Sequence, residues 1–170
     1  MTSASADTAV QGRGTLPAEL TDSTPFLLKR LGFIAKDRSL EAYEESGLHP
    51  YHHAILLALA ESPRETQGSI ADALGYDRGQ LVGLLDELES RGLVARRRDP
   101  ADRRRHVVEL TPDGRRELER LRKLSRRLED DFLAPLDADE RRRLHELLLT
   151  LGRYHCPRVA RSTEPPEPGP

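Results

Sequence analysis

The stretch from Gln67 to Thr111 constrains the fold of this 170-residue chain more than any other. Its first part, Gln67–Leu74, places apolar residues at helical spacing and ends before Gly75. Asp77 is a good N-cap for a second helix, and Gln80, three residues later, makes the pair close to a capping box. Two short helices joined by a turn of this length predict a helix-turn-helix.

The second of these helices, expected from Asp77 to Arg91, is amphipathic. Its apolar stripe recurs at i, i+3, i+4 and i+7 and consists of Leu81, Leu84, Leu85 and Leu88. The opposite face carries Gly79, Val82, Gly83 and Asp86. Because a helix-turn-helix presents its second helix to the DNA major groove, we expect this opposite face to meet DNA. Gly92 supplies the helix end.

Two strand-like runs follow, Leu93–Arg98 and Arg104–Leu110, on either side of the turn-forming tetrad Asp99–Asp102. Six of the ten residues from Arg96 to Arg105 are arginine and two are aspartate, a local charge of +4 in a chain whose net charge is −2. A hairpin this basic beside a recognition helix resembles a wing, whose tip can reach the minor groove or phosphates.

This order of elements is similar to the MarR family of winged-helix regulators. The matching residues are the wing sequence Asp99-Pro100-Ala101-Asp102-Arg103-Arg104 and the segment Leu110-Thr111-Pro112-Asp113-Gly114 that follows it. The resemblance extends over about Pro25 to Tyr154. It implies a homodimeric transcription factor that responds to a ligand and is usually a repressor.

The resemblance also implies roles for the wing residues. Arg104 would enter the minor groove, Asp102 would brace it, and Arg103 and Arg105 would contact phosphates. Arg98, at the end of the first strand-like run, belongs to the same predicted DNA-binding surface. The alternative is that the arginine run is only a solvated face.

The recognition face carries two glycines one turn apart, Gly79 and Gly83. Each glycine lowers the stability of a helix by about 0.5–1 kcal/mol relative to alanine, so the presence of two on one exposed face requires an explanation. One hypothesis is that they let the backbone approach the bases, with Val82 near a thymine methyl and Arg78 or Gln80 bonding a base edge or phosphate. The alternative is that Gln80 only closes the cap and that the glycines are tolerated.

The start of the preceding helix carries Thr66, Gln67 and Ser69. Amide groups at a helix N-terminus suit a phosphate oxygen, and capping is the simpler role for these side chains. Both roles remain open.

Three histidines, His49, His52 and His53, raise the question of a metal site. Two of them fall at a helix start and His53 lies on an apolar stripe, so we expect no metal and no cofactor; capping, core packing or a pocket lining are the alternatives. If the ligand site of the MarR family is kept, the resemblance implies that it is lined by Phe33, Tyr51 and His52.

The segments 25–46 and 112–154 read as long amphipathic helices flanking a winged helix-turn-helix at 50–111. They carry more apolar surface than a compact winged helix can bury, so we expect them to pair two chains. A two-fold dimer places its recognition helices about 34–36 Å apart and reads an inverted repeat. Residues 1–24 and 157–170 are expected to be disordered tails, and the fold class is mainly α with a small β-hairpin wing.

Composition excludes several classes of protein. No apolar run approaches the roughly 20 residues needed to span a bilayer, so we expect a soluble, cytoplasmic chain without a membrane partner. The single Cys156 rules out an intramolecular disulfide and, with no second cysteine to resolve a sulfenate, disfavours oxidant sensing. No catalytic motif is present, so we expect no enzyme.

Two functions remain. The leading interpretation is a dimeric, sequence-specific regulator that binds double-stranded DNA and represses until a small aromatic or lipophilic effector releases it. The alternative is a winged-helix module that docks an acidic protein partner through its arginine hairpin. Steep salt dependence and a preference for one inverted repeat would distinguish the first from the second.

Overall fold

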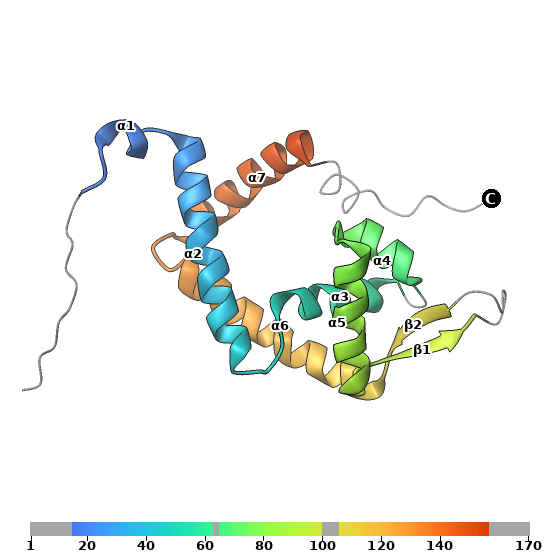
Figure 1. The fold of residues 1–170 in the computed structure, drawn as a ribbon. Coiled ribbons are helices and arrows are strands. Elements are labelled where there is room, and N and C mark those ends of the chain that lie inside the picture. Colours follow the sequence, from blue (N-terminus) through green and yellow to red (C-terminus); the bar gives the residue numbers. More distant parts are fainter. Residues whose placement is uncertain (1–14, 63–64, 100–105, 157–170) are drawn as a thin grey trace, which may run out of the picture. The chain divides into compact units, whose positions relative to one another are not determined.

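The computed structural model describes residues 15–62, 65–99 and 106–156 (Figure 1). These residues fall into two compact units, one ending at Asp37 and the other beginning at Arg38. The first unit holds α1, Ala18–Thr21, and most of α2, Thr24–Glu44, which continues into the second unit. Helix α1 lies within the predicted tail 1–24 and was not expected, because four residues are too few to show a periodic pattern.

The second unit contains the predicted helix-turn-helix, hairpin and C-terminal helices. In order these are α3 Pro50–Glu61, α4 Gln67–Leu74, α5 Arg78–Ser90, β1 Val94–Arg98, β2 His106–Leu110, α6 Pro112–Phe132 and α7 Ala138–His155. The strands pair antiparallel, with Val94 opposite Leu110 and Arg98 opposite His106. The prediction of a mainly helical fold with one small hairpin is confirmed. Among the described helices, none is long and apolar enough to cross a membrane.

The helices begin at the capping residues that the sequence indicates. Thr111 caps α6, accepting a hydrogen bond from the Gly114 amide at 3.0 Å, and Pro112 occupies the first turn. Asp137 and Glu140 form the predicted capping box of α7, with side-chain-to-backbone bonds of 2.9 Å in both directions.

The core of the second unit lies around α3, which packs against α4, α5, α6 and β2. Its completely enclosed side chains are Ile55, Leu56, Ile70, Leu81, Leu85, Leu88, Val108 and Leu121. Three of them belong to the leucine stripe predicted for the recognition helix. Leu84, the fourth member of the stripe, is partly buried and packs against the same cluster. The stripe therefore fixes which face of α5 looks outward.

The first turn of α6 comes very close to the start of β1. A Cβ atom added at Gly114 would lie 1.9 Å from the carbonyl oxygen of Leu93. Thr111 joins the same two elements, because its hydroxyl donates to the Gly92 carbonyl at 2.6 Å and its amide donates to the Leu93 carbonyl at 3.1 Å. This close approach accounts for glycine in the Leu-Thr-Pro-x-Gly segment.

Gly114→Ala should therefore destabilise the fold by about 1–3 kcal/mol, because backbone must move to admit the methyl group. Gly83→Ala is the matched control, since a Cβ at this exposed position of α5 meets nothing within 4 Å. The control should stabilise the protein by about 0.5–1 kcal/mol through helix propensity. Urea titrations of the three proteins give the comparison, and equal stability of Gly114→Ala and wild type would contradict the close approach.

Candidate nucleic-acid interface

The outward face of α5 is exposed along its length. Val82 is 42% exposed, and Arg78, Gly79, Gln80 and Gly83 are also exposed. The helix therefore offers a face with small side chains in its middle and polar side chains at its N-terminal end, opposite the buried leucines.

The N-terminus of α5 is held by Asp77. Its carboxylate oxygen Oδ1 accepts hydrogen bonds from the amides of Gly79 at 2.8 Å and Gln80 at 3.2 Å, which is the Asp77 half of the predicted capping box. A Cβ at Gly79 would lie 3.1 Å from this oxygen, a tight contact, whereas one at Gly83 would meet open space. The tight contact with Asp77 explains a glycine at position 79, whereas no contact within the described chain explains the glycine at position 83.

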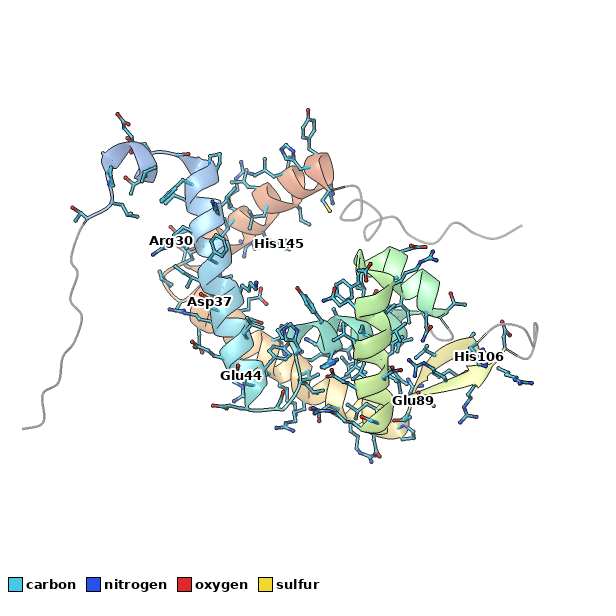
Figure 2. The ribbon with its side chains drawn as sticks, in the orientation of Figure 1. Arg30, Asp37, Glu44, Glu89, His106 and His145 are labelled. Carbon is cyan, nitrogen blue, oxygen red and sulfur yellow. The ribbon has the colours of Figure 1, made fainter. Side chains whose placement is uncertain are left out.

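The start of α4 combines a cap with an open hollow. Thr66 and Ser69 form a reciprocal capping box, with bonds of 3.1 Å and 2.9 Å, so capping is the role observed for both side chains. Thr66, Gln67 and Gly68, together with His106 at the start of β2 (Figure 2), line a cavity of about 320 Å³. Residues at the start of α4 and at the start of β2 therefore border one surface depression.

The second strand of the hairpin is attached to the chain just before α4. The amide of Val108 donates to the carbonyl of Glu65 at 2.8 Å, and Val107 and Val108 are buried. Arg97 and Arg98 are exposed on the first strand. The predicted tip residues Asp102, Arg103, Arg104 and Arg105 lie outside the described residues.

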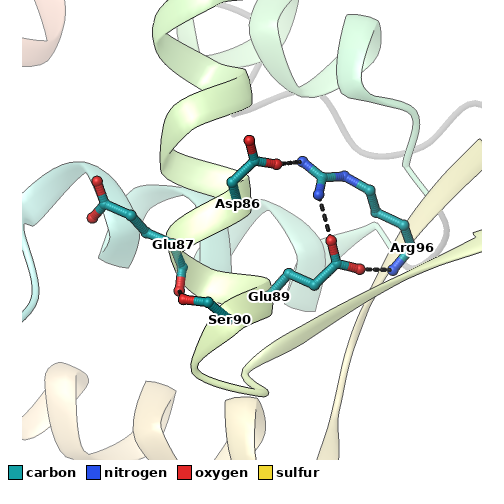
Figure 3. A network of polar contacts seen from close by, with 5 residues as sticks. All are labelled: Asp86, Glu87, Glu89, Ser90 and Arg96. Carbon is teal, nitrogen blue, oxygen red and sulfur yellow. Dashed lines mark hydrogen bonds and ion pairs between the residues drawn. The ribbon is translucent and has the colours of Figure 1, made fainter.

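A third arginine of the hairpin, Arg96, points to α5 instead of outward (Figure 3). Its guanidinium contacts Asp86 at 2.6 Å and also pairs with Glu89, while its amide donates to Glu89 at 3.1 Å. With the Gln67 amide oxygen turned to the guanidinium, that oxygen accepts from Arg96 Nε at 3.0 Å and Nη2 at 3.2 Å. Hydrogen bonding from the Arg96 amide is the largest cause of a lowered pKa of Glu89. The sequence does not reveal this network, because no spacing along the chain pairs a strand residue with a helix face.

The histidines of α3 take structural roles. His49 Nδ1 accepts from the Tyr51 amide at 3.2 Å, and His52 Nδ1 accepts from the His49 amide at 3.0 Å. The neutral His52 ring therefore carries its proton on Nε2, which lies 3.2 Å from Glu87 of α5. His53 Nδ1 is 2.6 Å from the Tyr43 hydroxyl. Among the described residues, no group of three or more histidine, cysteine, aspartate or glutamate residues could hold a metal ion.

The other predicted pocket residues are partly exposed. Tyr51 is 38% exposed, and its ring packs against that of Tyr76 with the ring centroids 5.0 Å apart and the planes tilted by 57°. Phe33 belongs to the first unit, where it is 54% exposed. A separate cavity of about 430 Å³ lies within the second unit between α2 and α6, lined by Arg38, Glu41, Ala42, Glu45, Leu124, Leu128 and Asp131. None of the three predicted pocket residues lines this cavity.

The buried histidines predict a pH dependence of stability. Burial lowers the pKa of both His52 and His53; Glu87 partly offsets this at His52, and Arg122 adds to it at His53. In the unfolded chain both rings titrate near the usual value of about 6.5, so the unfolded state binds more protons below that pH. The free energy of unfolding should therefore fall as the pH is lowered from about 6.5 toward the depressed folded-state pKa values.

Urea titrations at about pH 7.5 and about pH 5.5 measure this loss, since few carboxylates titrate in that window. The double variant His52→Asn, His53→Asn should show a smaller loss between the two pH values, whatever its absolute stability. The same pH dependence in wild type and double variant would contradict the assignment.

Known proteins resemble this chain in sequence and in structure. A sequence model described as "MarR family" matches residues 46–105. A putative transcriptional regulatory protein for the hcr operon of Thauera aromatica is 34% identical over 131 residues, which cover 72% of this chain and 79% of that protein.

Solved structures agree with the sequence comparison. The transcriptional repressor CouR bound to a 23-mer DNA duplex superposes with a TM-score of 0.73 at 36% identity, covering 82% of this chain and 99% of that one. CouR bound to p-coumaroyl-CoA superposes with a TM-score of 0.67 at 35% identity, covering 80% and 96%.

Proposed function

Because the chain belongs to the MarR family, whose members are transcriptional regulators and not enzymes, we propose that it is a sequence-specific regulator that binds double-stranded DNA as a homodimer. Membership of the family confirms the resemblance predicted from the wing residues and the expectation that the chain is no enzyme. The observation that carries the proposal is the exposed face of α5 beside a basic hairpin. A relative at 36% identity is a repressor bound to a DNA duplex.

In this proposal each part of the interface has one task. The recognition face of α5 meets base edges in the major groove, and the amides at the start of α4 meet a phosphate. The wing contacts the minor groove and backbone. The proposed DNA-binding residues are Thr66, Gln67, Ser69, Arg78, Gly79, Gln80, Val82, Gly83, Arg98, Asp102, Arg103, Arg104 and Arg105.

Pairing of two chains is supported by apolar side chains left exposed on the flanking helices. Leu147, Leu148 and Leu151 of α7 are 49%, 42% and 44% exposed. On α2, Leu27 and Leu31 are 41% and 49% exposed. A second copy of the chain would remove this apolar surface from water and give the inverted-repeat preference.

We further propose that the protein acts in the cytoplasm as a repressor of transcription. A small aromatic or lipophilic effector would release it from DNA. A relative at 35% identity binds p-coumaroyl-CoA, an aromatic acyl thioester. Candidate sites are the cavity between α2 and α6 and the predicted lining Phe33, Tyr51 and His52. Adding p-coumaroyl-CoA to the protein–DNA complex tests this class of effector, with free coenzyme A as the control.

The DNA-binding proposal is tested by selecting duplexes from a random library with the full-length protein. The selected duplexes should contain an inverted repeat with half-sites one helical turn apart. Affinity for them should fall with salt at a log–log slope of about −0.9 for each phosphate neutralised. Recovery of no common sequence, together with weak binding to every duplex, would contradict the proposal and favour the protein-docking alternative.

A further inference from the structure

Arg96 differs from the arginines that follow it in the hairpin. Its side chain is 21% exposed, whereas that of Arg97 is 71% exposed. The guanidinium links β1 to α5, where it contacts Asp86 and Glu89. With the Gln67 amide oxygen turned to the guanidinium, Gln67 at the start of α4 accepts from it as well. Figure 3 shows Asp86 and Glu89 turned to Arg96, and Glu87 turned to the other side of α5.

The contacts with Glu89 hold both the backbone and the side chain of Arg96. One carboxylate oxygen accepts from the Arg96 amide at 3.1 Å, and the other pairs with the guanidinium. A residue whose guanidinium is held by two carboxylates and whose main-chain amide donates to one of them has a defined orientation, which a single flexible ion pair lacks. The direction in which β1 leaves α5 is thereby specified.

The network is poorly suited to stabilising the fold as a whole. Asp86 and Glu89 are 60% and 40% exposed, and ion pairs with such exposed partners add little to folding stability. A two-stranded hairpin, in contrast, has little rigidity of its own. The expected effect of the network is therefore on the angle of the hairpin.

We propose that Arg96, Asp86 and Glu89, here called the Arg96 brace, set the angle between the β1–β2 hairpin and the recognition helix and so place the wing on DNA. The inference rests on the proposed function and deepens it, because it assigns Arg96 as a positioning residue and not as a DNA contact. The two acidic residues, which by charge alone would repel phosphates, then promote DNA binding through Arg96.

This role reverses the sign expected from simple electrostatics. Neutralising a carboxylate near DNA removes a repulsion and should strengthen binding. Neutralising Glu89 releases the hairpin, so Glu89→Gln should weaken binding instead. Glu87→Gln is the matched control, because it removes the same charge two residues away on the same helix and keeps a side chain of the same shape beside His52.

The experiment uses full-length proteins and two duplexes derived from the selected inverted repeat. One duplex includes the base pairs that flank the half-sites, and the other ends at the half-sites and gives the wing nothing to contact. On the longer duplex Glu89→Gln should bind about tenfold more weakly than wild type, within the usual scale for losing a wing contact. On the trimmed duplex it should bind as tightly as wild type or more tightly, and Glu87→Gln should do so on both duplexes.

A double-mutant cycle shows whether Glu89 acts through Arg96. Arg96→Ala should also weaken binding to the longer duplex, and adding Glu89→Gln to it should produce no further loss. Weaker binding of Glu89→Gln on both duplexes, or an additive loss in the cycle, would overturn the brace. Tighter binding of Glu89→Gln on the longer duplex would overturn it too. Wild-type protein that prefers no duplex would instead overturn the proposed function.

Discussion

Burial of the leucine stripe of α5 is the interaction on which the reading surface depends. Leu81, Leu85 and Leu88 lie in the core with side chains of α3 and α4, so rotation of the helix would expose them to water. Burying a leucine side chain is worth about 1.5–3 kcal/mol, and three of them outweigh any preference of the opposite face. The face that carries Val82 and Gly83 therefore looks outward because the other face cannot.

The position of the hairpin depends partly on α5. It is attached at three places: β2 joins the chain before α4 through Glu65 and Val108, the start of β1 meets α6 through Thr111, and Arg96 joins β1 to α5. The first attachment is a backbone hydrogen bond, and in the second the hydroxyl and the amide of Thr111 donate to backbone carbonyls. Both lie at buried or closely packed positions and hold the base of the hairpin. The third attachment, from Arg96 to α5, involves side chains outside the core. Substitutions on this face of α5 can therefore change the attachment without disturbing the core.

Local signals in the sequence predicted much of this arrangement. Periodicity located the helices, and the caps at Asp77, Thr111 and Asp137 located their starts, because both signals act between residues three or four apart. The partners of Arg96 and the reason for Gly114 were not predictable, since both depend on how a strand crosses a helix. The roles of Thr66 and of the α3 histidines were open in the sequence, and the structure shows capping and burial for them.

The central claim is that the outward face of α5 lies against bases in the major groove. Cross-linking from position 82 tests this claim most directly. In a Cys156→Ser background, Val82→Cys carries the photoreactive label on the recognition face, and Glu87→Cys carries it on the side turned away from Asp86. The account predicts cross-links from position 82 to bases within each half-site of the selected repeat, and far fewer from position 87. Equal cross-linking from both positions, or none from position 82 in a complex that forms normally, would contradict it.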